Sequence, residues 1–503
     1  MITGHLPVIA VMAPLLGAIF CVLARGSFLA WFLTVIGAAI PAISSLVILV
    51  RVYGGGVISY HLGGWEPPWG IEFRFDAANA FVLVIVSAVG LCCAFYARKS
   101  VADEIPPSSQ PLFYAMLLLC LGGMLGVVAT GDAFNLFVFL EISSLSAYVL
   151  VAMGAQRDRR ALTAAFNYLV IGTIGASFYV IGLGLIYMLT GTLNMADMAV
   201  RVNGLGDNTA LLTGFAFIMV GLSLKFAMFP LHFWLPNAYT FAPSVVTAFL
   251  AGTATKVALY AGLRILYTVF SIGFLFQTET MLYVFLPLGL AAVFVASITA
   301  IFQDNVKRML AYSSIAQIGY LLIGVSFANI GGLMAAILHL FNHAILKSGL
   351  FLALGCVVYR TGSCSVASFR GLGHQMPWTM AALVVGALGM IGMPATVGFT
   401  SKWFLVLAAI DSGGWFVALA IVAGSLLALI YFGRVIEAAY LQPAPENSAI
   451  AEAPLMLLLP VWLLMITSIT FGINSELPVT MAQAAAQALF LDPHNGLPAQ
   501  VGP

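Results

Sequence analysis

Five ionisable residues lie inside long apolar segments of this sequence. Glu141 interrupts the apolar run GDAFNLFVFLEISSLSAYVL at residues 131–150, nine residues after Asp132. If this segment is a helix rising about 1.5 Å per residue, Glu141 lies about 13 Å into a membrane core about 30 Å thick. The other four are Lys225, Lys256, Lys347 and Lys402. A charge at the centre of a membrane helix costs about 2.5–3.5 kcal/mol, so these groups must be paired, neutralised or hydrated.

These residue types can carry protons. Burial disfavours the charged form of both lysine and glutamate, so buried copies of either exchange protons closer to neutral pH than exposed ones. A single Lys–Glu pair is explained equally well as an interhelical contact that holds the bundle together. Four lysines and one glutamate do not balance in charge, which favours a path for protons or ions.

Proline and glycine accompany two of these lysines. Lys225 is followed five residues later by Pro230, and Lys402 follows Pro394 within a Gly-containing segment. Proline removes a backbone hydrogen bond and interrupts a helix. Two broken helices that each carry a lysine, one in each half of the chain, are typical of a transporter site. The alternative is that Pro and Gly are simply common in membrane helices.

Histidines add a second pattern. His339, His343 and Lys347 recur at a spacing of four, which places them on one face of a helix. Because histidine titrates near neutral pH, we interpret this face as a proton relay. A metal site is the alternative, although no third ligand is evident. Lys256 lies about 18 Å into its own helix, a depth at which it can bridge Lys225 and the histidines.

The composition indicates what must position these residues. The chain of 503 residues is 62% hydrophobic and 7% charged, with a mean hydropathy of +1.07. Its apolar runs have helical length, which predicts a polytopic helical membrane protein rather than a barrel. The first segment has no basic region before its apolar stretch, so we expect a retained helix and not a cleaved signal.

Other functional classes find no support. The six cysteines form no CxxC pattern, and neither a P-loop nor a GxGxxG motif after a strand is present. We therefore expect no cofactor and no bound metal. A net charge of +1 argues against nucleic acid as a partner.

Hydropathy predicts fourteen spans. They begin near Leu6, Phe28, Ala77, Leu112, Ala133, Leu162, Ala210, Pro243, Met281, Arg308, Gly331, Trp378, Trp415 and Pro454. With the N-terminus outside, eleven basic residues lie in inner connections and four at outer ends. This distribution satisfies the positive-inside rule and predicts that both termini face outward.

Three long motifs resemble a known family. GDAFNLFVFLEISSLSAYVL, LKFAMFPLHFWLPNAYTFAPSVVTAFLAGTATK and HLFNHAILKSGLFL are similar to the antiporter-like subunits shared by Mrp-type cation/proton antiporters and respiratory complex I. The resemblance covers roughly residues 76–440 and is strongest to the D-type subunit of Mrp antiporters. It implies an all-α membrane protein of about fourteen helices, with two inverted five-helix repeats and two broken helices. The implied units are N-terminal helices (1–111), a first repeat (112–268), a second repeat (281–440) and the last helix with a short tail (441–503).

The resemblance also implies roles for individual residues. Glu141 and Lys225 are expected to form an ion pair that controls the proton affinity of the lysine. Lys256, His339, His343 and Lys347 are expected to form a central hydrated axis, with Lys402 as the terminal proton donor or acceptor. Asp132 is expected to cap its helix at the membrane surface.

The function implied is transport. The resemblance predicts a membrane subunit of a multisubunit Na⁺(K⁺)/H⁺ antiporter, acting with other subunits in the bacterial inner membrane. Its implied partners are those subunits, H⁺, Na⁺ or K⁺, and the lipid bilayer. The alternative is a proton-pumping membrane subunit of an NADH–quinone oxidoreductase or a related redox complex, and a third possibility is a structural scaffold.

Overall fold

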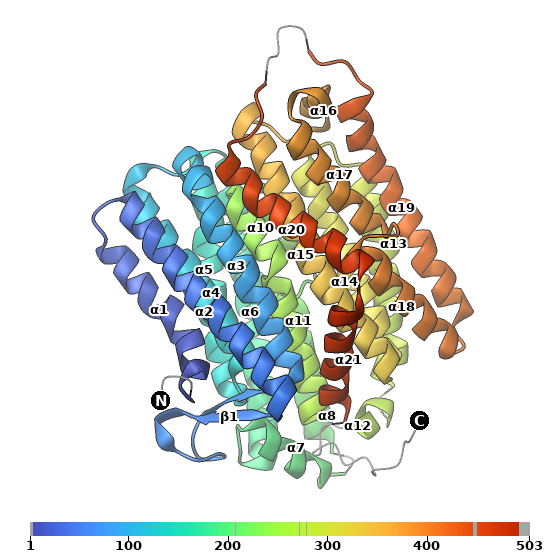
Figure 1. The fold of residues 1–503 in the computed structure, drawn as a ribbon. Coiled ribbons are helices and arrows are strands. Elements are labelled where there is room, and N and C mark those ends of the chain that lie inside the picture. The colour runs from blue at the N-terminus through green and yellow to red at the C-terminus, as the bar shows by residue number, and fades with distance from the viewer. Residues whose placement is uncertain (1–3, 207, 271, 278, 446–449, 492–503) are drawn as a thin grey trace.

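The computed structural model describes residues 4–206, 208–270, 272–277, 279–445 and 450–491. This part of the chain forms a bundle of long helices that run between two ends of the molecule (Figure 1). Twelve of its helices are long and apolar enough to cross a membrane, judged by length and composition. Two shorter apolar helices, Thr209–Lys225 and Pro377–Ile391, complete the fourteen predicted spans. The two short helices are the ones whose Pro and Gly residues predicted a break.

The first six spans are continuous helices. They are α1 (Leu6–Leu23), α2 (Ser27–Gly55), α3 (Ala77–Glu104), α4 (Gln110–Ala129), α5 (Ala133–Ala152) and α6 (Arg160–Thr190). Polar side chains begin two of them. Asp76 accepts hydrogen bonds from the backbone N–H of Ala78 and Asn79, and Asp132 accepts one from Asn135 at 2.6 Å. Such caps satisfy N–H groups that a helix start leaves free. The predicted capping role of Asp132 is confirmed, although its side chain is buried rather than exposed at the surface.

The next two spans are interrupted. They consist of α8 (Thr209–Lys225) with α9 (Trp234–Phe241), and α10 (Ser244–Gly252) with α11 (Ala254–Arg264), which a π-helical turn extends to Val269. The first interruption was predicted from Pro230. The second, at Gly252 and Thr253, was not predicted, since we expected one continuous helix from Pro243.

The remaining long helices form the second half of the bundle. They are α13 (Leu286–Ile301), α14 (Val306–Ser326), α15 (Ile330–Thr361), α17 (Pro377–Ile391), α18 (Val397–Asp411), α19 (Trp415–Tyr440), α20 (Leu455–Ile473) and α21 (Glu476–Phe490). Short helices occur in connections: α7 (Met195–Asn203), α12 (Ile272–Gln277) and α16 (Leu372–Gln375).

Corresponding helix caps occur in the two halves of the chain, at opposite ends of the bundle. Asp132 caps the fifth span and forms an isolated β-bridge with Asn194, while Asn305 caps the tenth span and forms one with Ser365. Because spans five and ten cross the membrane in opposite directions, these matching features lie at opposite ends of the bundle. They agree with two inverted five-helix repeats, whose boundaries at 112–268 and 281–440 stay a prediction.

Two elements were not predicted. The segment after α2 forms an antiparallel hairpin of β1 (Ile58–His61) and β2 (Glu72–Phe75), an element for which we made no prediction. The residues after α20 form α21, where we expected a short tail. One side of α21 buries Ala482, Ala485, Ala486 and Leu489 within the bundle, so small apolar residues fix this helix.

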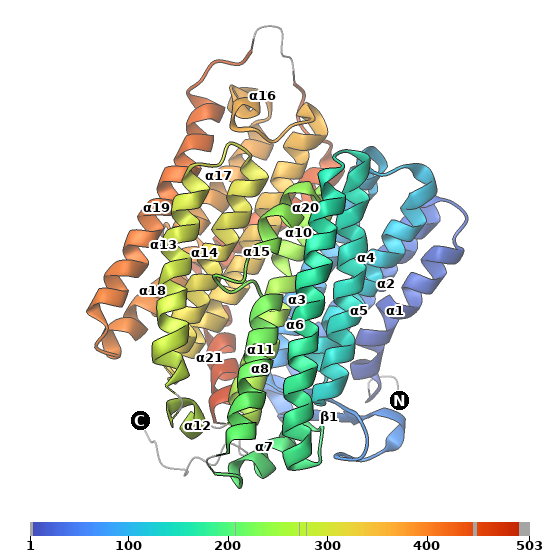
Figure 2. The ribbon, with the colours of Figure 1, turned by 180° about the vertical axis from the view of Figure 1, so that it is seen from behind.

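The chain begins and ends at the same end of the bundle. The first turn of α1 and the last turn of α21 lie together with the hairpin and α7 at the lower end in both views (Figures 1 and 2). An even number of spans requires this arrangement. The assignment of this end to the outside of the cell stays a prediction.

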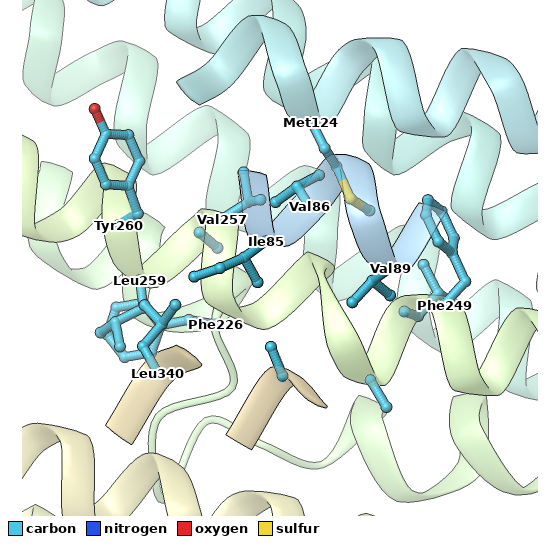
Figure 3. Close-up of a cluster of buried hydrophobic side chains, with 14 of the residues drawn as sticks. Ile85, Val86, Val89, Met124, Phe226, Phe249, Val257, Leu259, Tyr260 and Leu340 are labelled. Carbon is cyan, nitrogen blue, oxygen red and sulfur yellow. The ribbon is translucent and has the colours of Figure 1, made fainter. Parts of the chain in front are cut away.

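Two of the helices that carry the lysines lie at the centre. In α15 and in the α10–α11 span, 94% of the most apolar window is buried, against 39% in α1 and 44% in α2. Figure 3 shows apolar side chains packed around the α10–α11 break, including Phe249 and Val257 on either side of it. The outer helices expose apolar side chains, as lipid-facing helices do.

Candidate functional site

Glu141 and Lys225 form a direct ion pair. Lys225 is the last residue of α8, and its Nζ donates to Glu141 Oε1 of α5 at 2.7 Å. Nζ also donates to Ser144 Oγ, one turn beyond Glu141, at 2.9 Å. The Lys225 side chain is 6% exposed and that of Glu141 is 22% exposed. The lysine is therefore buried against a carboxylate that keeps an open side.

The break after Lys225 places a histidine in the same region. Trp234 Nε1 donates to the carbonyl of Leu224 at 3.0 Å, which satisfies a group freed at the end of α8. His232 stacks between the rings of Phe229 and Phe233. Its Nδ1 is buried and has no hydrogen-bond partner among the described residues. We did not single out this histidine from the sequence, although it stands seven residues from Lys225.

Lys256 lies beside the second break. Its Nζ donates to the carbonyl of Ala251 and, at 3.4 Å, to Thr255 Oγ1. Ala251 is the penultimate residue of α10, where helix carbonyls lose their intrahelical partners. No carboxylate pairs with Lys256 in the described part of the chain, so a main-chain carbonyl is its principal partner.

The predicted His–His–Lys face is present on α15. The rings of His339 and His343 stack with centroids 6.3 Å apart. His339 Nδ1 contacts Ser401 Oγ at 2.9 Å, and its Nε2 contacts Gln317 Oε1 at 3.0 Å. Lys347 Nζ donates to the carbonyl of Leu310 at 2.8 Å.

His343 differs from its neighbours on that face. Both its ring nitrogens are buried without a hydrogen-bond partner among the described residues. Lys256, Lys347 and His339 are within electrostatic interaction range of it. His343 is thus close to both central lysines, and its proton-exchanging atoms are unengaged by described protein groups.

Lys402 occupies the third break. The carbonyls of Met390 and Ile391, at the end of α17, accept hydrogen bonds from its Nζ at 2.9 and 3.1 Å. Ser425 Oγ of α19 accepts a third at 2.9 Å, and the Tyr320 ring lies 4.9 Å from Nζ. Ser401, the preceding residue in the chain, contacts His339 and so joins Lys402 to the histidine face.

The structure brings most of the predicted residues together. It places Glu141 against Lys225, and it groups Lys256, His343 and Lys347. It also connects His339 to the neighbour of Lys402. Within the described ranges, no hydrogen bond or ion pair joins Lys225 to Lys256, so this step of the predicted relay has no direct protein contact.

The sequence alone did not reveal several of the groups that contact the buried lysines. Tyr320 and Ser425 contact Lys402 from α14 and α19, more than twenty residues away. The carbonyl acceptors of Lys256 and Lys347 carry no side-chain signal at all. Only the Gly–Thr pair at 252–253 hinted at the second break.

Comparison with known proteins shows which family this chain is similar to. Residues 130–428 match the family described as NADH:quinone oxidoreductase/Mrp antiporter, transmembrane. This chain belongs to that family. The match contains Glu141, the four lysines Lys225, Lys256, Lys347 and Lys402, and both histidines of α15.

Relatives come from both branches of the family. The chain is 43% identical over 90% of its length to NADH-quinone oxidoreductase subunit N of Desulforudis audaxviator, and covers 90% of that protein. It is 31% identical to the D-type subunit of a Na⁺/H⁺ antiporter from Alkalihalophilus pseudofirmus, covering 89% of each chain. In structure it is similar to a chain of the Mrp complex from Dietzia sp. DQ12-45-1b, with a TM-score of 0.87, 25% identity and 98% of both chains covered. The membrane antiporter-like fold expected from the sequence is confirmed.

Proposed function

We propose that this chain is a membrane subunit of a multisubunit Na⁺(K⁺)/H⁺ antiporter and moves protons along its buried glutamate, lysines and histidines. The observation that carries the proposal is the 2.7 Å contact between Lys225 and Glu141 at the end of a broken helix. A permanent structural pair needs no interrupted helix and no open side. The similarity to a D-type antiporter subunit and to the Mrp complex supports the same function.

The pair acts as a switch in this proposal. While Glu141 touches Lys225, its negative charge stabilises the protonated amine. When the carboxylate moves away, the buried ammonium loses its counter-charge and releases its proton. The break after α8 permits this movement, because the backbone there is not held by a continuous hydrogen-bond ladder.

The proton then travels toward Lys402. Lys256 receives it without a direct hydrogen bond from Lys225 among the described residues, and His343 is within interaction range of both Lys256 and Lys347. His339 passes it toward Ser401 and Lys402, whose ammonium exchanges it at the far break. In this scheme Glu141, Lys225, Lys256, His339, His343, Lys347 and Lys402 are the working residues.

The partners, location and orientation of this subunit are proposed from its relatives and from the distribution of its basic residues. Its structural neighbour is a chain of a multisubunit complex, so we propose other antiporter subunits as its partners. We propose the bacterial inner membrane as its location. The end of the bundle with most of the basic residues then faces the cytoplasm, and the end with the hairpin faces outward.

A second function has a specific observation in its favour. The 43% identity to a subunit of NADH-quinone oxidoreductase exceeds the 31% identity to the antiporter subunit. In such a complex the same residues would pump protons in response to a redox reaction elsewhere. The residues of this chain suit both functions. The test must therefore determine whether cation exchange or a redox reaction drives the proton movement.

The test is ion exchange in everted membrane vesicles from cells that express the whole gene cluster. A pH-sensitive dye reports proton movement after addition of Na⁺ or K⁺, and then after NADH. Lys225→Ala is compared with wild type and with Lys99→Ala, which removes an exposed lysine. Cation-triggered proton movement that only Lys225→Ala abolishes supports the antiporter. Proton movement driven by NADH alone and dependent on Lys225 supports the redox pump instead.

A further inference from the structure

A polar cavity lies at the end of the bundle that the positive-inside rule assigns to the cytoplasm. It has a volume of about 260 Å³ and opens between the first and second halves. Its walls come from the end of α3, the connection after α5, the start of α14 and the connection after α15. None of the proposed relay residues lines it, so its polar character needs another explanation.

Glu104 links this cavity to the bundle interior. It lines the cavity at the end of α3, yet its side chain is only 8% exposed. Both carboxylate oxygens accept the backbone N–H of Ser244, at 3.2 and 3.0 Å, and Ser100 Oγ donates at 2.9 Å. Ser244 begins α10, the helix that ends beside Lys256. The carboxylate therefore caps the first turn of that helix.

Other ionisable groups surround this carboxylate. Arg157 lies 3.7 Å from Glu104 Oε2. The remaining groups are Asp158 in the connection after α5, Arg160 at the start of α6, Lys307 at the start of α14, Cys364 after α15, and Tyr96 and Asp103 on α3 itself. Basic and acidic side chains are mixed around the cavity, which therefore suits an exchanging proton better than one bound anion or cation.

Hydroxyl groups continue from Glu104 toward the central lysines. Ser244 Oγ is fully buried and has no partner among the described residues. A Cβ added at Gly355 would clash with the Tyr96 hydroxyl and lie 3.1 Å from the Cβ of Ser244, so these groups converge there. Tyr96 donates to the carbonyl of Leu352 at 2.9 Å.

The same face of α15 leads onward to the lysines. Ser348, one turn from Leu352, donates to the carbonyl of Ala248 at 3.4 Å. It packs against Gly252, where a Cβ would clash with its hydroxyl. Lys347 is the preceding residue in the chain, and Lys256 follows Gly252 by four residues. Polar groups thus follow the α3–α10–α15 junction from the cavity to the relay.

We infer that Glu104 is the residue through which the relay exchanges protons with the solvent of the cavity. A proton bound by the carboxylate passes, through water that bridges the hydroxyls of Ser244, Tyr96 and Ser348, to the neutral amine of Lys347 or Lys256, and the carboxylate returns to its ionised form. The reverse sequence releases a proton to the cavity. This assignment rests on the proposed proton transport. It adds a site of proton entry that was not expected from the resemblance to the family.

The competing explanation is that Glu104 only caps α10. Glu104→Gln separates the two roles, because the amide oxygen still accepts the Ser244 N–H while the side chain can no longer carry a proton. The matched control is Asp103→Asn, which removes a neighbouring carboxylate that also pairs with Arg157 but is 38% exposed. Both variants are measured in everted vesicles, where the cytoplasmic end faces the medium and the pH of that medium can be varied.

We expect Glu104→Gln to slow antiport by about a hundredfold or more, the range that positioned proton-transfer groups contribute. Its rate should also depend less on the pH of the medium, while Asp103→Asn stays within about twofold of wild type. A full rate in Glu104→Gln, or a slower rate with an unchanged pH profile, overturns the inference. If Glu104→Gln does not assemble, Ser244→Ala keeps the backbone N–H bond to Glu104, and an undiminished rate in that variant overturns the inference equally.

Wild type and Lys225→Ala are run in the same experiment. If wild type shows no antiport, or Lys225→Ala retains it, the proposed function fails. If wild type transports, Lys225→Ala does not, and Glu104→Gln behaves as wild type, only the assignment of Glu104 fails.

Discussion

Replacing Glu141 with glutamine should destabilise the protein and stop antiport. At 2.7 Å, and with an effective dielectric constant of about 20, the attraction between the two charges is about 6 kcal/mol. Desolvation of both groups offsets much of this energy, and breaking a buried pair costs about 3–5 kcal/mol in measured cases. Because the Glu141 side chain is 22% exposed, we expect the lower end, about 3 kcal/mol. The cost arises from Lys225, whose buried ammonium loses its counter-charge and must either stay charged without a partner or release its proton.

A double variant separates this electrostatic cost from transport. Glu141→Gln with Lys225→Met leaves no buried charge at the site, so stability should return close to that of wild type. Antiport should remain absent, because neither the proton carrier nor its switch is left. Unfolding in mixed detergent micelles measures the stability, and the vesicle assay measures transport. A single variant as stable as wild type, or a double variant that transports, would refute the switch.

Three further predictions concern single positions. Lys402→Ala should abolish antiport in the vesicle assay while the complex still assembles, since its partners are carbonyls and a hydroxyl rather than another charge. His339→Ala should lower the free energy of unfolding by about 1–3 kcal/mol more than His343→Ala, because only His339 bonds to other side chains and its removal leaves the buried Gln317 Oε1 without that partner; equal losses would contradict this. Gly221→Val should cost about 1–3 kcal/mol or more, since its Cβ would lie 2.6 Å from a carbonyl of α6. Gly433→Ala, in open space, should be neutral or slightly stabilising, and expression and melting temperature compare the two.

The sequence was sufficient wherever a local signal exists. Long apolar runs predicted the spans, and the prolines near Lys225 and Lys402 predicted the two breaks that α8–α9 and α17–α18 show. The spacing of His339 and His343 predicted one helical face. These successes share a cause: hydropathy, proline geometry and helical period act over a few residues.

The groups that accept hydrogen bonds from the lysines could be identified only from the three-dimensional structure. Every residue has a backbone carbonyl, so nothing in the sequence marks that of Ala251 or Leu310 as a lysine partner. The approach of Glu104 to Ser244 joins residues 140 positions apart. Neither contact has a periodicity or a composition that reveals it, and only the packing of α10 against α3 and α15 creates both.

The helix breaks accommodate two of the buried lysines that have no carboxylate partner. Lys256 and Lys402 both bind carbonyls at the last residues of an interrupted helix, where such groups have no intrahelical partner and carry the negative end of the helix dipole. These acceptors stabilise an ammonium without adding a titratable group. A carboxylate at each lysine would hold its proton too firmly for onward transfer, whereas a carbonyl holds it weakly. We therefore regard the breaks at α10–α11 and α17–α18 as proton-binding elements in their own right, and Glu141 as the one charge-based control in the relay.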